Sequence, residues 1–75
     1  MTTQISMSKT TRYGHFELSG MVNGERVSVI TTNSEAFDWY NDNDNEEKHA
    51  EAIAYCERTL TNAYNYKHEN YEQNF

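Results

Sequence analysis

The clearest pattern in the chain is an alternation of apolar and polar residues on both sides of Asn23-Gly24. An Asn-Gly pair favours a two-residue type I′ turn, because both of its residues readily adopt positive φ. This turn fixes a register that places Val22 opposite Glu25, Gly20 opposite Val27, Leu18 opposite Val29 and Phe16 opposite Thr31. One face then carries Phe16, Leu18, Val22, Val27 and Val29. The turn and the alternation therefore predict the same β-hairpin with one buried face.

Two shorter segments extend this pattern. Residues 4–8 also alternate, and we expect them to add a third antiparallel strand, since an isolated hairpin is rarely stable. Residues 34–41 are ambiguous: Ser34 followed by Glu35 is typical of a helix start, whereas in a strand Phe37 and Trp39 would point to the same side. The pattern slightly favours a short helix, and in either form the aromatic rings complete the core.

From Asp44 onward the period becomes helical. Asp44 can cap the helix, with Glu47 three residues later as in a capping box, and the acids suit the positive end of the helix dipole. Within about a third of the circumference lie His49, Ala52, Ile53, Cys56, Leu60, Ala63 and Tyr64. Lys67 falls in the same sector, so the amphipathic pattern ends near Tyr66, and we expect residues 67–75 to form a frayed tail.

Together these segments predict one α+β domain over residues 1–75. A small antiparallel sheet of two or three strands packs against the C-terminal amphipathic helix, with a short helix before it. No apolar run approaches the roughly 20 residues that span a bilayer, and no secretion signal opens the chain. We therefore expect a cytoplasmic protein that does not bind membranes.

Charge narrows the function further. The 75 residues include 12 acidic and 6 basic ones, a formal net charge of -6, which argues against direct nucleic-acid binding. Residues 1–37 carry three acids and three bases, so the whole surplus belongs to residues 38–75. Six of the nine acids in that half fall between Asp38 and Glu51. An asymmetry of this kind points to an acidic interaction surface.

Two groups of residues suggest metal or nucleophilic chemistry, and neither fits. The acidic turn at 42–46 lacks the sixth-position glycine of an EF-hand, and its twelfth position, counted from Asp42, is Ile53 instead of glutamate. His49 and Cys56 share a helix face but lie about 10 Å apart along the axis. Cys56 also sits within the apolar stripe, away from the exposed setting of a nucleophile. We expect neither an enzyme nor a bound metal or cofactor.

The acidic segment is the candidate functional surface. From Asp44 to Glu57 it carries five carboxylates over about 20 Å, or about one per 4 Å, close to the roughly 3.4 Å spacing of phosphates along one DNA strand. Such a surface suits the Lys and Arg groove of a protein that holds nucleic acid. With Tyr55 as an aromatic anchor, the expected partner-binding residues are Asp38, Asp42, Asp44, Glu46, Glu47, Glu51, Tyr55 and Glu57.

In length, acidity, asparagine content and lack of catalytic motifs, the whole chain resembles the small phage-encoded anti-CRISPR and anti-restriction inhibitors. Several of these are acidic α+β domains that imitate DNA. The resemblance implies a non-enzymatic inhibitor in the cytoplasm of a bacterial host, which blocks a nucleic-acid or interface surface of a host defence nuclease complex. The alternative is a small structural or regulatory module that homodimerises through a sheet edge or a helix face, with the acids serving only solubility.

Overall fold

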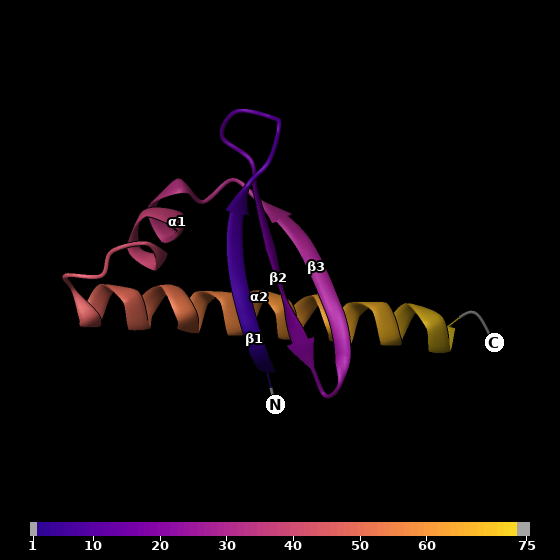
Figure 1. Ribbon diagram of the computed structural model, residues 1–75. Helices are drawn as coiled ribbons and strands as arrows, with labels where there is room; N and C mark the ends of the chain where they lie inside the picture. Colours follow the sequence, from indigo (N-terminus) through magenta and orange to yellow (C-terminus); the bar gives the residue numbers. More distant parts are fainter. Residues whose placement is uncertain (1, 74–75) are drawn as a thin grey trace.

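The computed structural model describes residues 2–73 and the side chains of residues 2–69. Three strands, β1 (Thr2–Lys9), β2 (Phe16–Val22) and β3 (Glu25–Thr31), precede a short helix α1 (Ser34–Tyr40) and a long helix α2 (Glu46–Gln73). The strands form one antiparallel sheet in the order β1-β2-β3, and α2 crosses one face of it (Figure 1). The α+β prediction, with a sheet on an amphipathic C-terminal helix, is confirmed.

The β2–β3 hairpin has the predicted turn and register. Asn23 and Gly24 have φ values of 51° and 85°, as the type I′ turn requires. The ladder pairs Val22 with Glu25, Gly20 with Val27, Leu18 with Val29 and Phe16 with Thr31. The local chemistry of two turn residues therefore places the whole buried face of the hairpin.

Strand β1 confirms the third strand and extends it at both ends. Its ladder with β2 shifts register between Thr3 and Ser6, where Gln4 has a φ of 54°. The extra residue changes which side chains face α2. Thr2 faces α2 before the shift, with its hydroxyl 3.2 Å from that of Thr61, and Met7 is buried opposite Leu18 after it.

Residues 34–40 form a helix, as slightly favoured by the sequence, but its cap is Asn33 and not Ser34. The Asn33 side chain accepts a hydrogen bond of 3.0 Å from the Ala36 N–H, and the Asn33 N–H donates to the Thr31 hydroxyl. The Phe37 ring stacks on Phe16 at 4.4 Å between ring centres. This contact with β2 joins the aromatic residues of α1 to the core.

Helix α2 begins at Glu46, and the predicted Asp44–Glu47 capping box is wrong. Asn45 caps the helix, because its side-chain oxygen accepts a hydrogen bond of 3.1 Å from the Lys48 N–H. The Asp44 N–H instead donates to the Asp42 carboxylate, which closes the preceding turn. The apolar stripe is confirmed, with Ala52, Cys56 and Leu60 all fully buried.

The structure also corrects the expected tail over residues 67–73, because α2 continues to Gln73. Lys67 lies in the apolar sector where that sector passes the hairpin, and its Nζ donates to the Glu25 carboxylate at 3.0 Å. The His68 ring nitrogen lies 3.4 Å from the other oxygen of Glu25. A polar partner on β3 therefore replaces apolar packing at this turn of the helix; residues 74–75 lie outside the described part.

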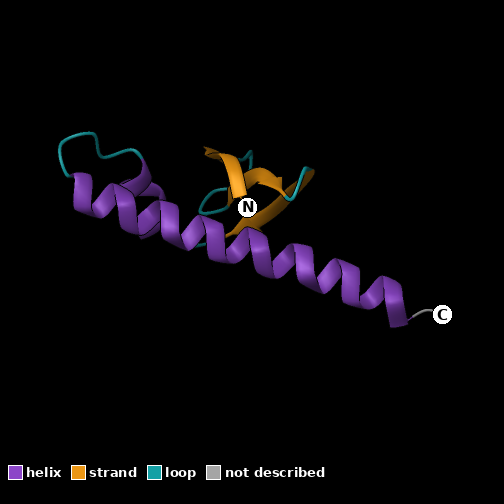
Figure 2. Cartoon of the chain, turned by 90° about the horizontal axis from the view of Figure 1, so that it is seen from below, coloured by secondary structure: helices purple, strands orange, loops and turns teal. Residues whose placement is uncertain are grey.

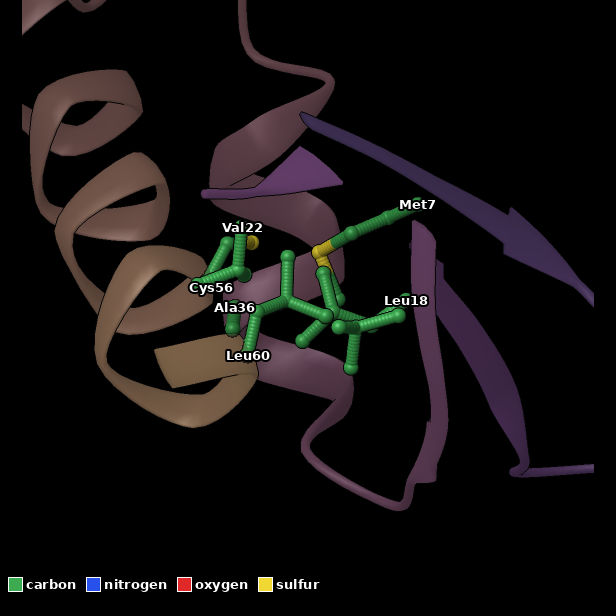
Figure 3. Packing of buried hydrophobic residues seen from close by; sticks show 7 residues of the cluster. Met7, Leu18, Val22, Ala36, Cys56 and Leu60 are labelled. Atoms are coloured by element: carbon green, nitrogen blue, oxygen red, sulfur yellow. The ribbon is translucent and has the colours of Figure 1, made fainter. Parts of the chain in front are cut away.

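The core lies between the inner face of the sheet and the two helices. Its buried cluster consists of Met7, Leu18, Val22, Val27, Ala36, Cys56 and Leu60 (Figure 3). The molecule measures 48 × 28 × 15 Å, and α2 extends past the sheet at both ends (Figure 2). One of these ends carries α1 and the loop between the helices.

Candidate partner-binding surface

Acidic residues gather at the end of the molecule formed by α1, the following loop and the first turns of α2. Residues 33–52 contain seven acids and one base, whereas the rest of the chain contains five of each. The full formal charge of -6 therefore belongs to this region. We call it the acidic end, and its carboxylates are those of Glu35, Asp38, Asp42, Asp44, Glu46, Glu47 and Glu51.

Most of these carboxylates lack a cationic neighbour. Within residues 2–69, Lys48 makes the one ion pair of the acidic end, with its Nζ 3.9 Å from the Glu51 carboxylate. The same Nζ lies 4.3 Å from the centre of the Trp39 ring. Both members of the ion pair are about half exposed, so the pair neutralises the surface only weakly.

The acids surround this end of the molecule and do not follow one edge. Asp42 and Glu46 border a shallow depression of about 150 Å³ beside His49. Glu35 and Glu51 instead line the groove between α1 and α2. The carboxylates along α2 thus lie on different sides of the helix, as its 3.6-residue period predicts. The surface is a rounded acidic cap instead of a strand-like row.

Two predicted residues lie farther along α2. Glu57 follows the acidic end on an exposed turn of the helix, next to Arg58. Tyr55 is half-buried against the core, and its hydroxyl lies 2.8 Å from that of Thr31. The Tyr55 ring is therefore fixed against the sheet and faces the groove between α1 and α2. It is less exposed than the aromatic anchor that the sequence suggests.

Sequence reasoning included Asp38 of α1 but missed two other residues of this helix, Glu35 and Trp39. Glu35 and Trp39 are four residues apart and both line the groove, opposite Glu51 of α2. Their spacing on a helix was the available signal, since residues i and i+4 share a face. Counting charges separately over residues 1–37 and 38–75 placed Glu35 in the neutral first part, although the fold brings it to the acidic end.

The histidine and cysteine on α2 already have structural roles. The His49 Nδ1 donates to the Tyr40 carbonyl at 2.8 Å, which joins the end of α1 to α2. Burial raises the pKa of the Cys56 thiol to about 11, so this sulfur stays protonated and unreactive near neutral pH. Over the described residues, no three His, Cys, Asp or Glu side chains converge as metal ligands would.

No family model, curated protein or solved structure matches this chain. In the described part, neither helix combines the length and apolarity needed to cross a membrane. What the protein does must therefore be inferred from its own residues, and the acidic end is the feature that most needs a functional explanation.

Proposed function

We propose that the protein is a non-enzymatic inhibitor of a bacterial host defence complex, whose nucleic-acid-binding surface it occupies with the acidic end. The observation that carries this proposal is the confinement of the whole charge of -6 to residues 33–52. A field of one sign at one end of a small protein steers it toward surfaces of opposite charge. Surfaces that bind nucleic acid are rich in Lys and Arg, because they neutralise phosphates.

Solubility alone explains this distribution poorly. A hydration coat works wherever acids are placed, yet the remaining surface is neutral, with five acids and five bases. Concentrating like charges costs stability by self-repulsion, and a chain of 75 residues has little stability to lose. A concentrated charge with few internal partners is better suited to pairing with cations of another protein.

The shape of the acidic end also favours insertion into a concave site. It lies at one end of an elongated molecule, 48 Å long and 15 Å across its thinnest dimension (Figure 1). Acids on several sides of such a tip can meet the walls of a basic groove together. Inhibition then follows from exclusion of nucleic acid, with no chemical step.

The test is capture of partners from a bacterial lysate on the immobilised protein, followed by release with duplex DNA. The variant Asp44→Lys/Glu47→Lys reverses two charges of the acidic end and spares Asp42, whose carboxylate holds the loop. The matched control Glu17→Lys/Glu69→Lys makes the same charge change at exposed positions outside the expected partner-binding residues. We expect DNA to release the partner from the native protein, the control to capture it, and the acidic-end variant to lose it.

Undiminished capture by the folded acidic-end variant would contradict the proposal, as would a partner that duplex DNA does not displace. A captured protein supports it only if the inhibitor also lowers that protein's own nucleic-acid binding. Circular dichroism of both variants checks that each remains folded.

A second candidate, homodimerisation, is favoured by one observation. Strand β3 is an edge of the sheet, pairs in unbroken register with β2, and carries Ile30 with 56% of its surface exposed. A regular edge strand can pair with a second copy. Sedimentation of the isolated protein separates the candidates, since a monomer at all concentrations excludes the dimer.

A further inference from the structure

A groove of about 350 Å³ lies between α1 and α2 within the acidic end. Its floor is formed by the small, buried side chains of Ala36 and Ala52, which leave room between the helices, and the exposed Ala54 also lines it. Trp39 and Tyr55 supply aromatic walls, and Tyr55 is held in place by its hydroxyl contact with Thr31. An apolar floor with aromatic walls suits the hydrocarbon part of a long side chain.

The rim of this groove is chemically different from its floor. Glu35 from α1 and Glu51 from α2 place carboxylates beside the aromatic walls. A cation placed there is attracted by the negative charge of the carboxylates and also by the quadrupole of the aromatic ring. The groove therefore combines features that complement one kind of ligand, a long side chain with a cationic head.

The chain itself shows that this combination holds a cation. The Lys48 ammonium lies 4.3 Å from the Trp39 ring centre and 3.9 Å from the Glu51 carboxylate. Lys48 approaches along α2, three residues before Glu51, and is about half exposed. An exposed pair of this kind is weak, so a better-fitting cation from outside can replace it.

We propose that the groove receives an arginine side chain of the partner, with its guanidinium against Trp39 and between the carboxylates of Glu35 and Glu51, in place of Lys48. This inference rests on the proposed function and names the contact that the acidic end makes. A guanidinium fits better than an ammonium, because its plane stacks on an aromatic ring while its fork donates two hydrogen bonds to a carboxylate.

Arg58 sets the polarity of the groove. It lies seven residues after Glu51, about 10 Å farther along the helix axis, so it lines the opposite end. The incoming arginine therefore enters at the Trp39 end, where the neighbouring charges of the acidic end are negative. An acidic ligand would instead seek Arg58, and this difference can be tested directly.

Trp39 is the single tryptophan of the chain, so its fluorescence reports on the groove. The full chain is titrated with acetylated, amidated tetra-arginine, tetra-lysine and tetra-glutamate peptides at low ionic strength. We expect a saturable change with tetra-arginine, a weaker affinity for tetra-lysine and no change with tetra-glutamate. Equal affinity for the lysine peptide would overturn the assignment to arginine, and binding of the glutamate peptide would assign the groove to an acidic ligand.

Variants locate the site. Glu35→Gln/Glu51→Gln should weaken tetra-arginine binding about tenfold, since each exposed ion pair contributes about a factor of three. The control Glu17→Gln/Glu69→Gln makes the same charge change at exposed positions outside the groove and should have a smaller effect. Lys48→Gln should tighten binding about threefold by removing the internal competitor. Arg26→Gln, an equal change on the exposed face of β3, should tighten it less.

The inference would be overturned if Glu35→Gln/Glu51→Gln weakened tetra-arginine binding no more than its control, or if Lys48→Gln tightened it no more than Arg26→Gln. The absence of a saturable fluorescence change with tetra-arginine would also overturn it. The outcome is distinguishable from failure of the proposed function. If DNA-competed capture of the lysate partner survives Glu35→Gln/Glu51→Gln, the acidic end acts without the groove. If peptide binding follows the predicted pattern but DNA never displaces the partner, the groove binds arginine and the proposed inhibition of nucleic-acid binding is wrong.

Discussion

At the residue scale, Gly20 of β2 lies where Leu60 of α2 and the backbone of β1 leave little room for a side chain. A side chain added at Gly20 would place its Cβ 2.9 Å from the Leu60 Cδ1 and 3.1 Å from the Thr3 carbonyl oxygen. The leucine end can move, but the backbone oxygen of the neighbouring strand cannot move cheaply. Glycine at position 20 is therefore favoured chiefly by the close backbone of β1, with Leu60 of α2 beside it, and not by a positive φ.

We expect Gly20→Ala to lower the free energy of unfolding by about 1–3 kcal/mol, the usual cost of overpacking a core. Urea unfolding followed by circular dichroism measures the change. Ser28→Ala on the exposed side of β3 is the control and should leave stability nearly unchanged. Equal midpoints for the two variants would show that the helix and sheet do not pack as closely as described.

Because of Cys56, we expect the free energy of unfolding to depend on pH in the alkaline range. Burial raises its pKa from 9.0 to about 11, so the folded state holds the thiol proton more tightly than the unfolded state. The stability from this group is complete below pH 9 and is lost as pH rises through 11. We expect the stability advantage of the native protein over Cys56→Ala to shrink across that range, by at most about 3 kcal/mol. A difference that stays constant with pH would refute this.

At the element scale, helix caps show how close alternatives are resolved. Asp44 and Asn45 both have side chains that cap helices, and so do Asn33 and Ser34. In both cases the asparagine caps the helix. Asp44 lies before the cap, where its N–H bonds to Asp42 in the loop turn, and Ser34 is already the first residue of its helix. Sequence therefore predicts each helix start to within two residues, whereas the loop geometry selects the capping residue.

The contact between α2 and the β2–β3 hairpin carries a second prediction. The hydrogen bond from Lys67 lowers the pKa of Glu25 below 4.5; desolvation opposes this shift, and the charges of Lys67 and His68 add to it. A group with a lowered pKa stabilises the fold above its unfolded pKa, and this contribution is lost as pH falls through the folded value. We expect Lys67→Met to return the Glu25 pKa toward 4.5 in a carboxyl NMR titration.

The same variant should speed amide hydrogen exchange in the part of α2 after Tyr66, because the Lys67–Glu25 pair, beside the His68–Glu25 contact, joins this region to the sheet. Lys9→Met, an equal change on β1, is the control for net charge. If the Glu25 titration is the same in both variants, the contact does not persist in solution.

At the scale of the whole molecule, the separation of charge predicts a dependence of stability on salt. The acidic end concentrates like charges, and Asp38 also lies near the negative end of α1. We expect Asp38→Asn to raise stability at low ionic strength by about 0.5 kcal/mol, as removal of a like-charge neighbour does. This corresponds to about 2–4 °C in Tm.

The gain should fall as salt is added, because screening weakens the repulsion in the native protein. Thermal unfolding at low and physiological ionic strength measures both effects. Glu17→Gln, on the neutral remainder of the surface, should change Tm little at either salt. A stabilised variant that also loses its partner would show that this charge is kept for binding at the expense of stability.

The sequence alone determined the features that depend on neighbours along the chain. Asn23-Gly24 fixed the register of β2 and β3, since a type I′ turn needs positive φ at both positions. The helical period placed Ala52, Cys56 and Leu60 in the core, and simple counting placed the charge surplus in the second half.

Tertiary structure decided what depends on residues far apart in the sequence. The stacking of Phe37 on Phe16 accompanies the helical form of residues 34–40, and the Glu25–Lys67 pair accompanies the continuation of α2. The packing of α1 against α2 brings Glu35 and Glu51 to the same groove. Periodicity records only which side of an element is buried; which elements then meet, and which polar groups find partners there, is set by packing in three dimensions.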